Sequence, residues 1–248
     1  MPSLYSAQQH LDLLNNHKII QLRYQINGAW QTAYFFHNSP DIKNIWLLFG
    51  GINSLALDWH RWFSEDNVNN GYLLIDYPGY GLNKGLPREK SMTLSSFEAF
   101  KALADHLKIS QEVLSLRLCA LGHSLGTGAA VNFALQIPLK RLILIAPFTS
   151  LNDLTIHRYG YIAGTFLNLV NPEKYDNNKA LGHIIMHSSR PEIIIVHGAD
   201  DMVIPVEMGR NLAAISPEKI SYYEIPEMGH QNMFATYFPF IQELMNSD

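Results

Sequence analysis

The amino-acid sequence predicts an α/β fold with a mostly parallel sheet of about eight strands. Five short runs are apolar almost throughout, which is typical of strands covered on both faces: residues 45–49, 72–76, 117–123, 141–147 and 192–198. Segments with helical spacing of apolar residues separate these runs, and an alternating apolar and polar segment precedes them. Alternation of strand and helix places helices on both faces of a parallel sheet.

Residues 19–36 predict an antiparallel strand pair at one edge of the sheet. Apolar and polar residues alternate from Ile20 to Ile26. The dipeptide Asn27-Gly28 then supplies the two positive-φ residues that a tight hairpin turn requires.

The later segments predict four helices and one further strand. The expected helices occupy residues 91–109, 124–137, 205–216 and 232–247, with a strand within residues 219–230. The second of these helices is rich in small residues, which suits close packing on a sheet. Pro239 is expected to start or kink the last turns of the final helix.

Composition fits one globular domain without a nucleic-acid partner. Of the 248 residues, 47% are apolar and 16% are charged, a balance that excludes a disordered chain. No linker rich in Pro, Gly or Ser divides the chain, so we expect a single domain over residues 1–248. A formal net charge of −4, with scattered Lys and Arg, gives no electrostatic reason to expect nucleic acid. The oligomeric state stays open.

No stretch predicts export or a membrane span. The N-terminal residues lack the basic start and apolar core of a signal peptide, and no apolar run reaches the roughly 18 to 20 residues that cross a bilayer. The single Cys119 excludes an internal disulfide framework and lies in an apolar run, where a buried filler is the expected role. We therefore expect a soluble, cytoplasmic protein.

Polar residues collect in the loops that leave the predicted strands, and in an open parallel sheet these loops share one rim. Residues 122–126 read Gly-His-Ser-Leu-Gly between a strand and the small-residue helix. That arrangement is a nucleophile elbow, in which a sharp turn strains Ser124 and exposes its hydroxyl. A side chain at Gly122 or Gly126 would collide in the tight turn. The alternative is an ordinary helix cap.

A serine nucleophile needs a base, and His230 is the histidine best placed to supply it, because it follows the last strand on the same rim. His123 is expected to point elsewhere and pack, and His197 to order its own loop. His183 and His187 could share a helix face, but no third ligand is evident, so neither a metal nor an organic cofactor is expected.

Together these motifs resemble the α/β-hydrolase superfamily, most closely its small single-domain serine hydrolases with esterase, thioesterase or peptidase-like relatives. The resemblance covers nearly the whole chain and rests on the segments LLFGGINS, LLIDYPGYG, GHSLG, IAPFTSL, HGADDMVIP and GHQN. It implies a triad of Ser124, Asp201 and His230 in the family's chain order. The family pattern selects Asp201 over its neighbour Asp200, with Asp153 as a more distant candidate.

The same resemblance implies an oxyanion hole made by the backbone N–H groups of Ile52 and Leu125. Gly51 or Asn53 would supply the first amide if the loop turns differently. Relatives often carry His-Gly where this chain has Gly50-Gly51. Because the donors are backbone amides, that difference need not destroy the hole.

The family inserts a lid at the place that residues 148–190 occupy here. Its apolar, aromatic stretch offers candidates to line an acyl pocket, namely Tyr159, Tyr161, Phe166 and Leu167. The alternative is that these side chains only pack the insertion onto the domain.

The sequence thus predicts a serine hydrolase that cleaves a small-molecule carboxylic ester or thioester through an acyl-enzyme. Because the histidine must be neutral to act as a base, activity should fall at acidic pH. Two alternatives remain. One keeps the fold and changes the reaction to acyl transfer, peptide hydrolysis or other α/β-hydrolase chemistry, and the other is a non-catalytic binding protein.

Overall fold

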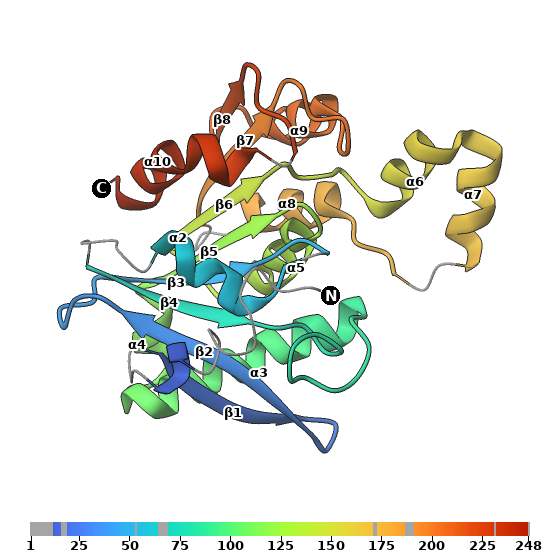
Figure 1. Cartoon of the computed structure of the whole chain (residues 1–248). Coiled ribbons are helices and arrows are strands. Elements are labelled where there is room, and N and C mark those ends of the chain that lie inside the picture. The colour runs from blue at the N-terminus through green and yellow to red at the C-terminus, as the bar shows by residue number, and fades with distance from the viewer. Residues whose placement is uncertain are drawn as a thin grey trace.

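The computed structural model describes residues 12–15, 19–52, 54–63, 69–170, 173–186, 191–230 and 232–247. One eight-stranded sheet lies at its centre, in the spatial order β1-β2-β4-β3-β5-β6-β7-β8 (Figure 1). The strands are β1 (Ile20–Ile26), β2 (Ala29–His37), β3 (Asn44–Phe49), β4 (Asn70–Ile75), β5 (Leu118–His123), β6 (Arg141–Ile145), β7 (Glu192–Gly198) and β8 (Ile220–Ile225). All pairs from β4 to β8 are parallel, which confirms the predicted α/β sheet.

The edge hairpin forms as its turn residues predict. β2 runs antiparallel to both β1 and β4, and the turn between the first two strands holds Asn27 at φ 49° and Gly28 at φ 79°. Both angles lie in the left-handed region that a two-residue hairpin turn uses. The hairpin therefore extends the parallel sheet by one antiparallel ribbon.

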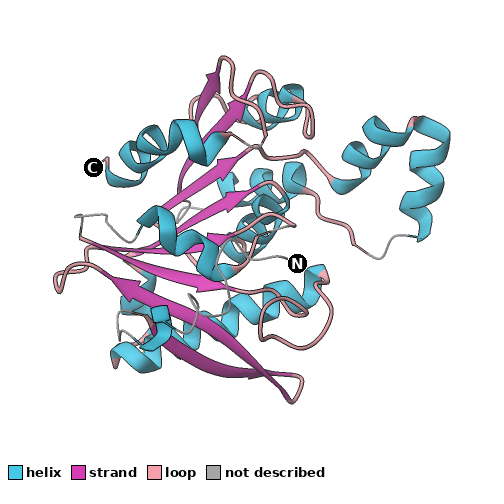
Figure 2. Ribbon diagram, viewed as in Figure 1, coloured by secondary structure: helices cyan, strands magenta, loops and turns pink. Residues whose placement is uncertain are grey.

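Helices cover both faces of the sheet (Figure 2). One face packs against α3 (Glu89–Leu107), α4 (Gln111–Ser115), α5 (Leu125–Ala134), α8 (Asn177–Met186) and α9 (Val206–Ala213). The other face packs against η1 (Ala56–Trp59), α2 (His60–Phe63) and α10 (Met233–Asn246). Pro239 lies inside α10, so it does not start the last turns, and a kink at this proline stays a prediction.

The central strands are apolar throughout because they are buried on both faces. In β3, Ile45 and Leu47 belong to the core on one face, while Trp46 and Leu48 belong to the core on the other. Cys119 is buried as predicted, and burial raises the pKa of its thiol to about 11. Its sulfur is therefore protonated at neutral pH and acts as core packing.

Three helices lie in the described part of the segment between β6 and β7. α8 packs into the core, whereas α6 (Leu151–Tyr159) and α7 (Tyr161–Val170) pair with each other and stand out from the rest of the domain (Figure 1). The loops that follow β5, β7 and β8 leave the sheet at the rim formed by the carboxyl ends of the strands, since these strands are parallel. That rim carries the candidate site.

Candidate active site

Ser124 lies in a strained turn between β5 and α5. Its backbone has φ 56° and ψ −123°, a conformation that residues with a Cβ rarely adopt. A Cβ on Gly122 would lie 2.6 Å from the Gly126 carbonyl oxygen, and a Cβ on Gly126 would lie 2.1 Å from the Phe49 carbonyl oxygen. The second collision is with the neighbouring strand rather than across the turn. Glycine at both places lets the turn close and holds the hydroxyl at the rim.

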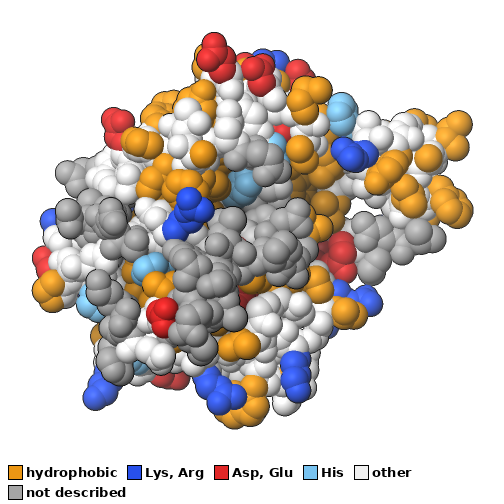
Figure 3. Space-filling view, viewed as in Figure 1, with side chains coloured by type: hydrophobic (Ala, Val, Ile, Leu, Met, Phe, Trp, Pro, Cys, Tyr) orange, Lys and Arg blue, Asp and Glu red, His pale blue; other side chains and the backbone are white. Residues whose placement is uncertain are grey.

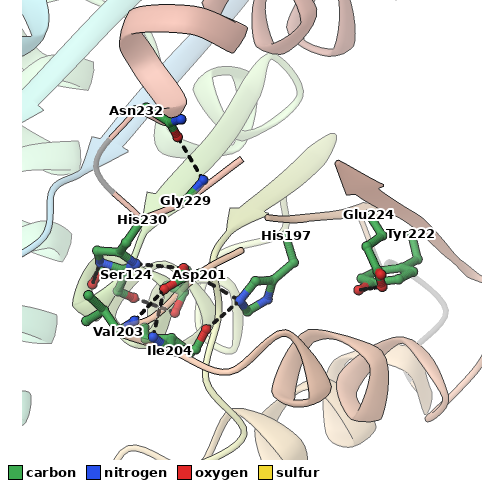
Figure 4. Close-up of polar contacts among 11 residues, drawn as sticks. Ser124, His197, Asp201, Val203, Ile204, Tyr222, Glu224, Gly229, His230 and Asn232 are labelled. Carbon is green, nitrogen blue, oxygen red and sulfur yellow. Dashed lines mark hydrogen bonds and ion pairs between the residues drawn. The ribbon is translucent and has the colours of Figure 1, made fainter. Parts of the chain in front are cut away.

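Ser124, His230 and Asp201 form one line of hydrogen bonds (Figure 4). The Ser124 Oγ lies 3.0 Å from Nε2 of His230, and Nδ1 of that ring lies 2.8 Å from Oδ2 of Asp201. With the proton on Nδ1, the ring donates to the carboxylate and accepts from the serine hydroxyl. This arrangement can move a proton from the serine to the imidazole while the carboxylate stabilises the resulting positive charge.

Both carboxylate oxygens of Asp201 accept hydrogen bonds. Its Oδ1 accepts hydrogen bonds from the backbone N–H groups of Val203 and Ile204 at 2.8 and 2.9 Å, and Oδ2 faces His230. Burial acts to raise the pKa of Asp201, but these hydrogen bonds outweigh it, and the net shift is downward. The carboxylate is therefore ionised at neutral pH.

His197 supports the loop that carries this acid. Its side chain is fully buried, and Nε2 lies 3.0 Å from the Ile204 carbonyl oxygen and 3.7 Å from Oδ2 of Asp201. Burial lowers the pKa of His197, so the ring is neutral at neutral pH and donates its Nε2 proton to the carbonyl. The predicted role of ordering its own loop is confirmed.

The loops of the acid and the base are tied together. The Asp200 N–H donates to the Met228 carbonyl oxygen at 3.1 Å, and the Gly229 N–H donates to Oδ1 of Asn232 at 2.8 Å. The histidine loop is thus fixed from both sides of Gly229, which positions the ring of His230.

His123 packs as predicted but does not point away from the site. Its ring centroid lies 5.2 Å from that of His230, and the Phe234 ring meets it edge-on at 5.3 Å. Burial lowers the pKa of His123 to about 3, and the neighbouring His230 ring acts in the same direction. A neutral His123 packs beside the base without adding charge. Sequence reasoning missed this contact because a turn's side-chain directions depend on its exact dihedrals.

The loop after β3 lies against the nucleophile. A Cβ built on Gly51 would stand 3.4 Å from the Ser124 Cβ, so the backbone of this loop passes directly beside the serine. On the other side, Leu125 is the first residue of α5, where the first amides have no intrahelical partner. The amides of Ile52 and Leu125 stay predictions as oxyanion donors, and Asn53 lies outside the described residues.

Three hydroxyl groups fix the peptide planes of that loop. Tyr77 donates to the Gly50 carbonyl oxygen at 2.8 Å, and Tyr80 donates to the Ile52 carbonyl oxygen at 2.8 Å. The Ser54 hydroxyl donates to the carbonyl oxygen of the intervening glycine at 3.1 Å. Because a peptide is planar with N–H opposite C=O, each bond also sets the direction of the next amide. The sequence motif DYPGYG was evident, but its bracing of the loop was not predicted.

The other candidate acids lie away from the base. Asp200 is exposed, and Asp153 accepts a hydrogen bond from the Thr149 hydroxyl at 2.7 Å in the first turn of α6. Neither has a described contact with His230. The geometry therefore separates Asp201 from both alternatives.

The candidate pocket residues lie on the α6–α7 hairpin rather than at the serine. All four side chains are exposed: Tyr159, Tyr161, Phe166 and Leu167. None has a described hydrogen bond or ring contact with Ser124 or His230. Their role in an acyl pocket stays a prediction.

The described residues include no cluster of His, Cys, Asp and Glu side chains that could hold a metal ion. Of the histidine pair considered from the sequence, His183 lies on α8 and His187 lies outside the described residues.

The serine aminopeptidase S33 model matches residues 66–191, slightly more than half of the chain. The chain belongs to this family. The matched range of this α/β-hydrolase family includes Ser124 and stops before Asp201 and His230, so those two residues rest on the geometry described above.

Two curated proteins and one solved structure add to this assignment. An uncharacterized protein of Mycobacterium tuberculosis, Rv2307c, is 31% identical over 160 residues, covering 64% of this chain and 53% of its own length. The lysophosphatidylserine lipase ABHD12 of Danio rerio is 31% identical over 166 residues, covering 61% of this chain and 41% of its own. This S33-family chain thus spans about half the length of the curated relatives it matches. An α/β hydrolase from Vibrio vulnificus has the same fold, with a TM-score of 0.72 at 18% identity over 96% of this chain and 84% of that one.

Proposed function

We propose that this S33-family protein is a serine hydrolase that cleaves a carboxylic ester or thioester through a covalent acyl-enzyme. The observation that carries the proposal is the hydrogen-bonded line of Ser124, His230 and Asp201, with spacings of 3.0 and 2.8 Å. These are the spacings that an activated serine requires. Membership in a hydrolase family supports the same reaction class.

In the first half-reaction, Ser124 Oγ attacks the carbonyl carbon of the substrate while Nε2 of His230 takes the hydroxyl proton. The new oxyanion accepts hydrogen bonds from the N–H groups of Ile52 and Leu125. The carbon–oxygen or carbon–sulfur bond then breaks, and Nε2 returns the proton to the leaving alkoxide or thiolate. An acyl ester on Ser124 remains.

In the second half-reaction, a water molecule attacks the acyl-enzyme and gives its proton to His230. Collapse of the second tetrahedral intermediate releases the carboxylic acid, and the proton returns to Ser124. Asp201 stays ionised throughout and stabilises the imidazolium in both halves, as its lowered pKa favours. No metal ion or organic cofactor takes part in this scheme.

The names of the relatives suggest which substrates to test first. The Danio rerio relative is a lysophosphatidylserine lipase, which acts on an ester of a single-chain phospholipid. The family model carries the name of a serine aminopeptidase, whose substrate is an amide. We propose the ester class first, because an ester has a better leaving group and needs no pocket for a free amino terminus.

The experiment is a substrate panel run with the intact protein and with Ser124→Ala. The panel contains p-nitrophenyl esters of increasing chain length, acyl thioesters, lysophospholipids and aminoacyl nitroanilides. We expect ester or thioester turnover that Ser124→Ala lowers by about 10⁴-fold or more. If the protein hydrolysed only the nitroanilides, its reaction would be that of a peptidase and the ester proposal would be wrong. Turnover that Ser124→Ala left unchanged would exclude Ser124 as the nucleophile. Added alcohol or amine nucleophiles in the same assays would reveal acyl transfer.

A further inference from the structure

The α6–α7 hairpin presents an apolar surface that nothing in the described structure covers. α7 exposes large apolar side chains from Tyr161 to Leu169, most strongly Ile162 at 87% and Leu169 at 79%. At about 100° per residue, its exposed residues spread over more than half of the helix circumference. In Figure 3 hydrophobic side chains gather at the hairpin, on the right of the molecule.

The two helices of the hairpin nevertheless pack directly on each other. Among the residues of α7 with described burial, Gly164 and Asn168 are buried, four apart on the face toward α6. A Cβ on Gly164 would lie 2.6 Å from the Ile156 Cα, so the two helices touch at this glycine. Asn168 Nδ2 also donates to the Asn152 carbonyl oxygen at 3.2 Å. The exposed apolar side chains are therefore presented by a defined structure.

Its charges differ from those of the rest of the chain. The one acidic residue of the hairpin, Asp153, lies in the first turn of α6 and accepts a hydrogen bond from Thr149, while Arg158 stands exposed beside Tyr159 and Tyr161 at the turn between the helices. The whole chain has a formal net charge of −4. A basic, tyrosine-bearing tip on an acidic protein matches the polar boundary of an anionic bilayer, where cations meet lipid phosphates and tyrosines favour the interface.

We propose that the α6–α7 hairpin docks on an anionic phospholipid surface, with the apolar side chains of α7 among the outer acyl-chain segments and Arg158 at the headgroups. The ten residues of α7 extend about 15 Å, half the thickness of a bilayer core. None of the described helices is long and apolar enough to cross a bilayer. The hairpin thus lies on the membrane and does not span it.

A lipid surface fits this helix better than a second protein chain does. A helix in a protein groove or pair buries a stripe and keeps a polar face, whereas exposed apolar residues here occupy most of the circumference. A fluid lipid phase can adapt to every face of α7 that α6 leaves uncovered.

The base of the hairpin adjoins the site. Leu151 and Leu154 of α6 pack with Leu125, the residue after Ser124, against a buried apolar cluster that includes Phe148. A docked hairpin would hold the nucleophile rim near the lipid surface, so this inference names an amphiphilic lipid ester as the substrate of the proposed hydrolase. The docking itself does not require that chemistry.

The test uses the full chain with Ser124→Ala, so that no vesicle lipid is hydrolysed. Its probes are sedimented vesicles of phosphatidylcholine alone and of phosphatidylcholine mixed with an equal amount of phosphatidylglycerol. We expect binding that is stronger on the mixed vesicles. Adding Ile162→Glu and Leu169→Glu should lower the partition coefficient at least about tenfold, because two charges enter the apolar face. Arg158→Gln should abolish the preference for phosphatidylglycerol.

The matched control places two glutamates on exposed apolar residues elsewhere. The control carries Val113→Glu and Leu116→Glu. Val113 lies on α4 with an exposed fraction of 40%, and Leu116 follows the helix with an exposed fraction of 76%. This control should bind vesicles like the parent. Circular dichroism spectra and thermal unfolding of both pairs should match those of the parent, which verifies folding without relying on hydrolase activity.

Absence of vesicle binding by the parent, or equal binding by the parent and the α7 variant, would overturn the proposal. So would a dimer in sedimentation velocity that Ile162→Glu and Leu169→Glu convert to a monomer, since a second copy would then cover the helix. Because binding is measured without the serine hydroxyl, failure of the proposed hydrolase chemistry would leave the vesicle result unchanged and is recognised separately.

Discussion

Asp200 and Asp201 are adjacent in the chain but differ in every contact. The carboxylate of Asp201 is buried, faces His230 at 2.8 Å and accepts two backbone amides. Asp200 is exposed. Within the proposed mechanism, Asp201 fixes the tautomer of the base, and Asp200 contributes only its backbone N–H to the loop.

Asp201→Asn should therefore lower kcat for a soluble ester by about 10⁴-fold, because an amide can neither stabilise the imidazolium nor keep the ring in the productive tautomer. Asp200→Asn is the matched control and should change kcat little. Steady-state kinetics of the two variants with one p-nitrophenyl ester make the comparison. A large loss from Asp200→Asn with a small loss from Asp201→Asn would mean that the acid is misassigned.

Asp76 is a buried carboxylate outside the triad. Its Oδ1 accepts the Ala56 N–H at 2.7 Å, and burial raises the pKa of the side chain to about 6, partly offset by that hydrogen bond. Because the folded-state pKa lies above the unfolded value of about 3.9, the folded state binds the proton more tightly. The stability that the protonated Asp76 side chain contributes to the free energy of unfolding is therefore present at low pH and is lost as the pH rises through about 6.

Asp76→Asn keeps an acceptor for Ala56 and removes the charge. As the pH rises from about 4 to about 7, the free energy of unfolding of the variant should increase relative to that of the parent. The difference should reach on the order of 3 kcal/mol, since each pKa unit corresponds to about 1.4 kcal/mol. Urea unfolding across this range gives the difference. Parallel stability curves for the two proteins would show that Asp76 does not titrate there.

At the scale of elements, the loop after β3 depends on groups that lie far from it in the chain. Tyr77 follows β4 and is buried, and burial raises the pKa of its hydroxyl well above the usual value, so it remains a donor to the Gly50 carbonyl oxygen. The Gly50 carbonyl shares its peptide plane with the Gly51 N–H, the alternative first oxyanion donor, so if that amide binds the oxyanion the tyrosine acts on catalysis by holding its direction.

Tyr77→Phe should lower kcat about tenfold with little change in KM, a fraction of the loss from removing an oxyanion donor outright. Tyr24→Phe is the matched control, because it also removes a buried hydroxyl, bonded to Ser95 Oγ at 2.8 Å, but lies away from the site. Both variants should lose about 1 kcal/mol of stability. Equal effects of the two variants on kcat would assign Tyr77 a purely structural role.

At the scale of the whole molecule, the parallel sheet could be predicted because its strands are buried on both faces and leave apolar runs in the sequence. The edge hairpin was evident from Asn27-Gly28, since few residues accept positive φ. The line from Ser124 to His230 could be anticipated because loops at the carboxyl ends of parallel strands share one edge.

Contacts between distant side chains were not predictable from local pattern. Tyr77 and Gly50 are 27 residues apart, and nothing in either segment alone indicates their hydrogen bond. The hairpin residues were a similar case. Their apolar character marked Tyr161 and Phe166 as buried in a pocket or packed on the domain, yet both are exposed. The apolar residues of the hairpin indicate that its surface has a partner, but the sequence does not identify that partner.

The central claim is that Ser124 is a nucleophile activated by His230, and covalent labelling tests it most directly. A fluorophosphonate forms a stable bond with an activated serine but not with an ordinary one. We expect the intact protein to be labelled at Ser124, as located by peptide mass spectrometry, and labelling to be lost in Ser124→Ala and strongly slowed in His230→Ala. A folded protein that is not labelled, or a Ser124→Ala variant labelled at the same rate as the parent, would contradict the claim.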